Sequence, residues 1–337
     1  DREPMNSSQP PTRRLLVAAA TVALAATTFA GAAKAQDDPA APRGNVTLNT
    51  TVTQETIDAV LVALEGVAPD LEVEVFRAPT VELGARIASD LRTGGLGADV
   101  LWMTDPLSIQ RYETEGLLAP LEGEVVDVVP EAYRSETFVG TRLLNLVLVA
   151  ADDAETVPKA WADLADPAFA DGVALPDPGF AGSAFAALGY LGTAEDFGME
   201  FYQALKDNGA VQLKSPVDTL TGVAEGVYAT GVTLDKIARA NIDKGAPIQL
   251  VWPEPGAIAL FSPAAVVAES DDLEAAQAFT AFLVSPEGQA AIASTGWQPV
   301  RDDVEWPYEE AVVTPDWSSL YGSQEQLLED YYAIFGE

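Results

Sequence analysis

The stretch that decides the fold covers residues 247–300, PIQLVWPEPGAIALFSPAAVVAESDDLEAAQAFTAFLVSPEGQAAIASTGWQPV. Its β-branched beginning predicts a strand at 248–252, and the Pro/Gly-rich run at 253–256 predicts a turn before a second strand at 257–267. An acidic start then leads into an apolar helix that ends near Ser285 and Pro286. The order is therefore strand, turn, strand and helix, with the helix closed by the motif SPEGQ.

This order resembles the periplasmic solute-binding proteins of ABC importers, in the branch that holds ferric-ion, 2-aminoethylphosphonate and phosphosugar binders. The resemblance covers nearly all of the chain after residue 35. It implies an α/β fold of the two-lobed type II periplasmic binding protein class, in which each lobe is a mainly parallel sheet flanked by helices. It also implies a hinge of two crossovers, a ligand between the lobes, a monomer, and an ABC permease in the inner membrane as partner.

The N-terminal region predicts export. Arg13 and Arg14 precede an apolar run at 15–30, and the tripeptide Ala33-Lys34-Ala35 closes it, which is the pattern of a cleaved signal peptide over residues 1–35. The run is short for a bilayer span of about 20 apolar residues. Export by the general or the twin-arginine route fits equally. Residues 36–43 are polar and Pro-rich, and we expect a disordered lead-in there.

Composition removes several classes of function. The chain has no Cys and no His, which excludes disulfides, a lipid-anchored cysteine, a Ser-His-Asp triad and a His-bearing zinc site. We therefore expect no enzyme, no cofactor, no resident metal, and a protein free in the periplasm. Asp and Glu number 52 against 18 Lys and Arg, a net charge of −34, which disfavours nucleic acid and anionic lipid as partners. Two origins of the acidity stay open, adaptation to salt and a cationic ligand.

Strand and helix patterns alternate along the chain. Strands are predicted at 45–50, 71–76, 99–103, 143–151, 172–175, 210–213 and 228–232, and helices at 54–67, 81–92 (capped by Thr80), 106–115, and from 183 and 216. Such alternation predicts parallel sheets covered by helices, whose ligands bind beyond the carboxyl ends of the strands. Lobe one is expected at 44–144 and 258–337, including the C-terminal helices, and lobe two at 145–257.

The loops of lobe one that follow its strands are rich in hydroxyl groups. Each leads into a helix, whose free N–H groups and positive dipole end favour an anion. Helix capping by the same side chains is the alternative reading. The candidate ligand-binding residues in these loops are Thr51, Thr53, Arg77, Thr80, Thr104 and Asp105.

In lobe two, the segment DPGFAGSA at 177–184 is the strongest site candidate, because small residues at a helix start let a ligand approach the backbone amides. It resembles the family segment that cradles the anionic end of the ligand. Arg142, near the lobe boundary, is a candidate for a guanidinium clamp on an anion. Lys214 with its neighbour Ser215 is a further candidate, as are the Thr233 hydroxyl and the Asp235 carboxylate for an organic ligand. The candidates from this part of the chain are Arg142, Phe180, Gly182, Ser183, Lys214, Ser215, Thr233 and Asp235.

These observations favour a periplasmic capture protein for a small anionic or zwitterionic solute, such as a 2-aminoethylphosphonate-like compound or an organophosphate, with Asp105 or Asp235 pairing the amine. An Fe(III)-binding protein is the alternative within the class. The adjacent tyrosines that ferric-ion members carry are replaced at 233–236 by Thr-Leu-Asp-Lys, which argues against it. A secreted α/β hydrolase or transferase is the alternative from another class, and the chain has no G-x-S-x-G motif to support it.

Overall fold

The computed structural model describes residues 41–123, 127–308 and 311–336. The predicted signal peptide and most of the predicted lead-in lie outside the described residues. The strands are β1 (Arg43–Thr50), β2 (Asp70–Arg77), β3 (Val100–Trp102), β4 (Phe138–Ala151), β5 (Val173–Pro176), β6 (Val211–Leu213), β7 (Thr230–Leu234), β8 (Ile248–Val251), β9 (Ala257–Val266), β10 (Gln298–Pro299) and β11 (Val312–Val313).

The α-helices among these residues are α1 (Gln54–Val67), α2 (Thr80–Leu91), α3 (Pro106–Thr114), α4 (Gly182–Thr193), α5 (Gly198–Asp207), α6 (Pro216–Ala224), α7 (Asp235–Ile242), α8 (Leu273–Leu283), α9 (Pro286–Ser294), α10 (Trp317–Leu320) and α11 (Gln324–Phe335). Short 3₁₀ turns lie at η2 (Glu131–Tyr133), η3 (Trp161–Ala165) and η4 (Pro167–Phe169). None of the described helices is long and apolar enough to cross a membrane.

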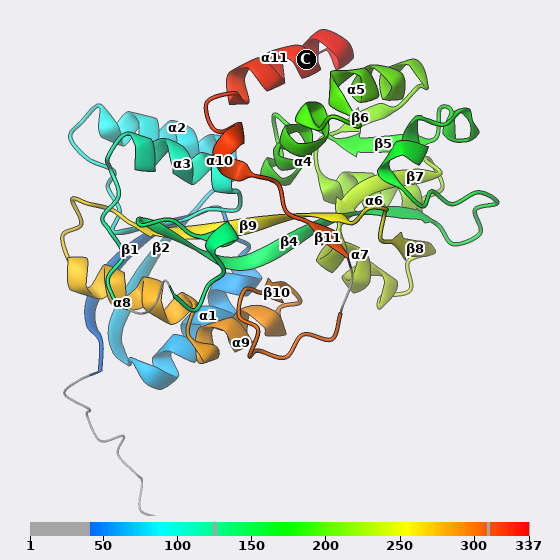
Figure 1. Ribbon diagram of the computed structural model, residues 1–337. Helices are drawn as coiled ribbons and strands as arrows, with labels where there is room; N and C mark the ends of the chain where they lie inside the picture. Colours follow the sequence, from blue (N-terminus) through cyan, green and yellow to red (C-terminus); the bar gives the residue numbers. More distant parts are fainter. Residues whose placement is uncertain (1–40, 124–126, 309–310, 337) are drawn as a thin grey trace, which may run out of the picture. The chain divides into compact units, whose positions relative to one another are not determined.

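The strands form one sheet in the order β2-β1-β3-β9-β4-β7-β5-β6. β1 pairs in parallel with β2 and β3, and β5 pairs in parallel with β6 and β7. Between these two parallel parts, β9 and β4 run antiparallel to each other. We call the part around β2-β1-β3 lobe one and the part around β7-β5-β6 lobe two (Figure 1). The predicted two-lobed α/β class is confirmed.

Strands β4 and β9 run through both lobes. They pair from Phe138 opposite Ala265 to Leu146 opposite Ile258, and the register shifts between Gly140 and Leu143. β9 also pairs with β3 of lobe one, and β4 also pairs with β7 and β8 of lobe two. The chain crosses between the lobes twice, once in β4 and once in β9. These two strands pair with each other, and we call the pair the β4–β9 ribbon.

Helices cover both faces of each part of the sheet. In lobe one, α2 and α3 lie on one face and α1, α8 and α9 on the other (Figure 1). In lobe two, α4 and α5 lie on the first face, and α6 and α7 bury Leu220, Val223 and Ala238 against Val149 of β4 on the second. Because both faces are covered, the central strands are buried along their whole length, and their apolar runs are continuous rather than alternating.

Three expectations about individual elements were wrong. Thr80 does not cap α2 but is its first residue, and Pro79 holds the capping position. β4 begins five residues before the predicted 143, because Gly140 and the register shift interrupt the apolar pattern that marks the rest of the strand. The motif SPEGQ opens a separate helix: α8 ends at Leu283, and the Ser285 side chain caps α9 by accepting from the Gly288 N–H at 3.1 Å.

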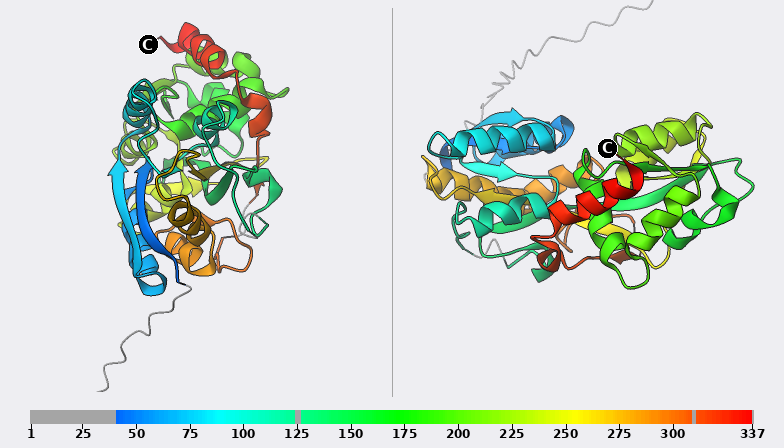
Figure 2. Two further views of the ribbon diagram at one scale, coloured as in Figure 1. Left: turned by 90° about the vertical axis from the view of Figure 1, so that its left-hand side faces the viewer. Right: turned by 90° about the horizontal axis from the view of Figure 1, so that it is seen from above.

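The C-terminal segment lies over the junction of the two lobes (Figures 1 and 2). Helix α10 packs on α3 of lobe one, whereas α11 packs on α4 and α5 of lobe two. The predicted lobe boundaries grouped this segment with lobe one. α11 contacts α4 and α5 through its buried residues Leu327 and Tyr331, and the predicted lobe boundaries stay a prediction.

Gly140 at the register shift predicts a specific sensitivity. A Cβ there would lie 2.9 Å from the Tyr133 carbonyl oxygen and 3.2 Å from the Phe261 ring. We expect Gly140→Ala to lower the free energy of unfolding by about 1–3 kcal/mol through overpacking, measured by urea denaturation. Gly84→Ala, in the middle of α2 where a Cβ meets nothing within 4 Å, should raise it by about 0.5–1 kcal/mol. Equal effects of the two changes would contradict the packing argument.

Candidate functional site

The first turns of the helices that follow the parallel strands meet at the junction of the lobes. On one side, Gly182 at the start of α4 packs on Asp105, the residue before α3; a Cβ on Gly182 would lie 2.9 Å from Asp105 Oδ2. On the other side, Lys236 Nζ of α7 donates to Glu55 Oε2 of α1 at 2.6 Å. These two contacts flank the junction, and the hollows beside them are the candidate ligand sites.

A pocket of about 560 Å³ opens beside the first contact, and we call it the α3–α4 pocket. Lobe one contributes residues of α2 and α3, lobe two contributes the segment 178–185, and the C-terminal segment contributes residues 321–328. Four predicted site residues line this pocket, namely Thr80, Asp105, Phe180 and Gly182. Residues from both lobes and from three distant parts of the chain are thus brought to one cavity.

Asp105 lies at the floor of this pocket and is only 3% exposed. Its carboxylate caps α3, accepting from the Ser108 N–H at 2.8 Å and from the Ser108 hydroxyl at 2.7 Å. Burial raises the pKa of the Asp105 carboxyl above its usual value, and the hydrogen bonds from Ser108 offset part of that rise. The capping reading of Asp105 is therefore confirmed, and its carboxylate is engaged within lobe one.

Asp177 holds the loop that enters α4. Its carboxylate accepts from the Gly179 N–H at 2.8 Å, from Gln212 Nε2 at 3.0 Å and from the Tyr332 hydroxyl at 3.0 Å. A side chain on Gly179 would collide with that hydroxyl, since a Cβ would lie 1.8 Å away. The loop is thus fixed from β6 and from α11, and Phe180 beside it remains 57% exposed in the pocket.

Two of the helix starts at the α3–α4 pocket have no side-chain cap. Neither Pro79 before α2 nor Ala181 before α4 accepts a hydrogen bond through its side chain. The first N–H groups of an α-helix have no partner within the helix, so they remain available to a ligand. α3 and α6 differ, because Asp105 and Ser215 cap them. At this pocket, the N–H groups that could receive an anion are therefore those of α2 and α4.

In the hollow on the other side, between α1 and α7, the charges of Glu55, Lys236 and Arg239 already have partners. Asp235 is buried and pairs with Arg239 at 2.5 Å, and Arg239 also donates to the Gly296 carbonyl at 2.9 Å. The Tyr308 ring lies 4.2 Å from the Arg239 guanidinium. Asp235 was predicted to pair an amine of the ligand, but in this structure its charge is balanced by an arginine on the next turn of α7.

The remaining candidates of lobe one lie around the same strand ends. The hydroxyls of Thr51 and Thr104 form a hydrogen bond of 2.8 Å. Thr51 follows the end of β1, and Thr104 follows the end of β3. Thr53 holds the capping position of α1, but its hydroxyl pairs with Thr56 at 3.1 Å and caps nothing. Arg77 donates to the Val52 carbonyl at 2.8 Å.

The remaining candidates of lobe two differ in their access to the junction. Ser183 lies buried in the first turn of α4, and the Lys214 ammonium lies 5.7 Å from the centre of the Phe180 ring. Ser215 caps α6 and donates to Asp218 at 2.7 Å. Thr233 is fully buried and donates to the Pro216 carbonyl at 2.8 Å. Ser183 and Lys214 are therefore close to the pocket, whereas the hydroxyls of Ser215 and Thr233 are used inside lobe two.

Arg142 lies at the register shift of β4 and is 1% exposed. Its Nη1 contacts the Thr56 hydroxyl at 3.4 Å, its guanidinium lies 4.6 Å from the centre of the Trp297 ring, and its Nε has no partner among the described residues. Burial lowers the pKa of Arg142 to about 9. In this conformation Arg142 lies beneath α1 and does not line the α3–α4 pocket.

Sequence reasoning missed two groups of residues at the junction. Lys236 and Arg239 were not selected, although their places in the first turns of a helix after β7 were the available signal. The C-terminal residues Tyr321 and Leu328 were also missed. No local pattern marks them, since only the path of the chain carries them to the pocket.

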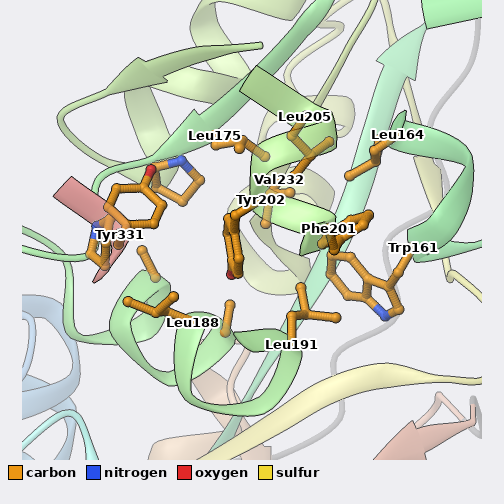
Figure 3. A pocket seen from close by; sticks show the side chains of 14 residues that line it. Trp161, Leu164, Leu175, Leu188, Leu191, Phe201, Tyr202, Leu205, Val232 and Tyr331 are labelled. Carbon is orange, nitrogen blue, oxygen red and sulfur yellow. The ribbon is translucent and has the colours of Figure 1, made fainter. Parts of the chain in front are cut away.

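A second cavity lies in the core of lobe two and is distinct from the junction (Figure 3). It is about 30 Å³ in volume and is lined by apolar and aromatic side chains, among them Trp161, Phe201, Tyr202 and Tyr331. This volume suits about one water molecule, and an apolar void of this kind tends to stay dry. We interpret it as a packing gap between α4, α5 and α11.

The architecture is that of the two-lobed type II periplasmic binding protein fold, and solved structures with this fold superpose on it. Iron-bound HitA from Pseudomonas aeruginosa superposes with a TM-score of 0.74 over 86% of this chain and 99% of that chain, at 21% identity. AfuA from Actinobacillus pleuropneumoniae, with fructose-6-phosphate bound, gives a TM-score of 0.75 over 87% of this chain and 98% of that chain, at 17% identity. These likenesses establish the fold.

The family follows from the sequence. Residues 51–298 match the family model of the bacterial extracellular solute-binding proteins, and the chain belongs to this family. It is 27% identical over 230 residues to a sulfate-binding protein of Synechocystis sp., a match that covers 62% of this chain. The chain spans 60% of the length of the curated relatives it matches.

Asp105 predicts a pH dependence of stability. Because its pKa is higher in the folded than in the unfolded protein, the folded state binds the proton more readily, and stability falls as pH rises from the unfolded pKa through the folded one. Asn caps helices as well as Asp. We therefore expect the melting temperature of Asp105→Asn, relative to the wild type, to rise between pH 4 and pH 7.

Asp316→Asn is a control for which we expect the opposite change of melting temperature with pH. Hydrogen bonds from Ser318 and Ser319 lower the pKa of Asp316, so its contribution to stability is present above the unfolded pKa. This variant should lose melting temperature relative to the wild type as the pH rises to the unfolded pKa of 3.8, and should change little between pH 4 and pH 7. Parallel curves for Asp105→Asn and the wild type would refute the role of burial.

From the surroundings of Arg142, we predict that its charge can be removed without loss of folding stability. A buried charge without an ionic partner is unfavourable, and apolar replacements of buried charges are often neutral or stabilising by about 1–4 kcal/mol. None of the ion pairs among the described residues includes Arg142. We expect Arg142→Met to unfold in urea at pH 7 with a free energy equal to or about 1 kcal/mol above that of the wild type. A loss of more than about 2 kcal/mol would show that Arg142 has a favourable partner.

Proposed function

We propose that this protein is the substrate-binding component of an ABC importer that captures a small anionic or zwitterionic organic solute between its lobes. The solute class is that of 2-aminoethylphosphonate-like compounds and organophosphates. One observation carries the proposal: the uncapped starts of α2 and α4, from different lobes, line the same pocket. Free N–H groups and two helix dipoles at one place suit a phosphonate or phosphate group.

The geometry supports a mechanism of capture by closure. α2 belongs to lobe one and α4 to lobe two, so an anion that accepts from both starts favours the conformation that brings them together. Lys214, beside Phe180, adds a positive charge from lobe two. The ribbon of β4 and β9 connects the lobes and is the hinge of this closure. A permease of the inner membrane then recognises the closed form and receives the solute.

The amine of a zwitterionic solute would require a free carboxylate. Asp235 is paired with Arg239, and Asp105 is hydrogen-bonded to Ser108 within lobe one. Of the two, only Asp105 lines the α3–α4 pocket. A bound ammonium group there would lower the raised pKa of Asp105 and so favour its charged form.

The two alternatives have less support. For Fe(III), the described residues hold no group of three or more Asp, Glu, His or Cys side chains that could bind a metal ion, and residues 233–236 carry Thr-Leu-Asp-Lys. For an enzyme, the family is one of solute-binding proteins. We propose a non-catalytic, monomeric protein without a cofactor, which a signal peptide directs to the periplasm and which binds no nucleic acid.

A thermal-shift screen tests the proposal. The panel contains 2-aminoethylphosphonate, methylphosphonate, glycerol phosphate, inorganic phosphate, sulfate, a polyamine and ferric citrate, all in high salt. A ligand that binds only the folded state adds about 2.7 kcal/mol of stability at 100 times its Kd. We expect shifts with phosphonates or phosphate esters. A shift with ferric citrate alone would support iron transport, and a shift with the polyamine alone would make the acidic composition the ligand signal.

Lys214→Met serves as the site variant of this screen. Loss of one partly solvated charge near the anion is worth about 1 kcal/mol, or about fivefold in Kd, measured by titration calorimetry. Lys159→Met is the matched control, because Lys159 lies in an exposed loop away from the pocket. Equal Kd values for the wild type and both variants would remove Lys214 from the site.

A further inference from the structure

The α3–α4 pocket is larger and more apolar than an anion requires. Its volume of about 560 Å³ falls in the range of about 300–1,000 Å³ that is typical of sites for organic ligands. A single phosphonate or sulfate group at the starts of α2 and α4 would leave most of that volume unfilled. The chemistry of the other lining residues, which form the remaining walls, therefore indicates what the rest of the solute is.

Apolar side chains from three parts of the chain form these walls. Met103 and Leu107 come from lobe one, Phe180 and Phe185 from lobe two, and Tyr321 and Leu328 from the C-terminal segment. Phe180 is 57% exposed although it lies in a loop that Asp177 holds in place. A large exposed aromatic ring on a fixed loop is typical of a contact surface for a ligand.

Some polar groups of the pocket already have partners. The Ser108 hydroxyl donates to Asp105, and Arg111 pairs with Glu115 at 3.0 Å. A second anionic group would meet Glu115 and Glu325 at the rim, where Arg111 is already neutralised.

The C-terminal segment lines one side of the pocket. α10 packs on α3, and α11 packs on α4 and α5, so the residues between and at the start of these helices cross from one lobe to the other. Leu328 and Tyr321 thereby add apolar surface to one wall of the pocket. Removal of water is the condition under which an apolar body contributes to affinity.

We infer that the solute is an organic anion with an apolar body, whose acidic group lies at the starts of α2 and α4 and whose hydrocarbon part fills the α3–α4 pocket. This inference rests on the proposed function, since it needs the anion at the two helix starts. Within the proposed solute class it favours alkyl or aryl phosphonates, phosphate monoesters or sulfonates over 2-aminoethylphosphonate itself, and it disfavours inorganic oxyanions and compounds with two anionic groups.

Calorimetric titration with inorganic phosphate and with methyl-, propyl-, hexyl- and phenylphosphonate tests this inference. Each buried methylene group should lower Kd about fourfold until the pocket is filled. Propylphosphonate and 2-aminoethylphosphonate form a matched pair of the same length, and we expect the propyl compound to bind more tightly. Equal affinities along the alkyl series, or tighter binding of the aminoethyl compound, would overturn the apolar body and leave the proposed function intact. No binding by any member would overturn both.

Gly84→Leu separates the pocket from the anion site. Gly84 lines the pocket from α2, and a Cβ there meets nothing within 4 Å, so a larger side chain can extend into the cavity without a clash in the helix. We expect the variant to raise the Kd of hexylphosphonate at least tenfold and to leave methylphosphonate unchanged. Gly66→Leu in α1, where a Cβ also meets nothing within 4 Å, is the control and should change neither. Unchanged binding of hexylphosphonate by Gly84→Leu would overturn the inference.

Discussion

The pairing of β4 with β9 is the constraint on which the rest of the structure depends. These two strands belong to both lobes at once, so every parallel strand is placed relative to them. Thr141, at the register shift, is held from three sides: it accepts from Trp102 Nε1 at 2.8 Å, donates to the Ser262 carbonyl at 2.8 Å, and its own carbonyl accepts from Gln289 at 2.6 Å. The hydroxyl and carbonyl groups of Thr141 are thereby satisfied, which a fully buried position requires.

A ribbon of this kind explains why the ligand site can be assembled from both lobes. Because β1, β2 and β3 lie on one side of the ribbon and β5, β6 and β7 on the other, their carboxyl ends face a common junction. The two contacts across it, Asp105 with Gly182 and Glu55 with Lys236, lie on opposite sides. An irregular register at one point of a two-stranded ribbon is also the natural place for bending, since β-bulges twist and bend strands locally.

The helix starts differ in whether a side chain caps them. α3 and α6 begin with Asp105 and Ser215, whose side chains satisfy the first turn. α4 begins after Ala181 with Gly182, which leaves its N–H groups free and lets Asp105 approach closely. At the pocket, the start of α4 therefore carries the small residue Gly182, whereas Phe180 and Phe185 supply apolar surface.

The sequence by itself determined the alternation of strands and helices, the two-lobed class, and the segment 177–184 at the pocket, because periodicity and local turn chemistry are properties of neighbouring residues. It also identified Asp105 and Gly182, which follow strand ends that a parallel sheet brings to one edge. The pairing of Asp235 with Arg239, one helical turn apart, was open to a local reading of the sequence. Only the tertiary structure decided that Arg142 is buried beneath α1 and that Tyr321 and Leu328 line the pocket. These facts depend on contacts between residues far apart in the chain or on how deeply packing buries a charge, and neither leaves a local pattern.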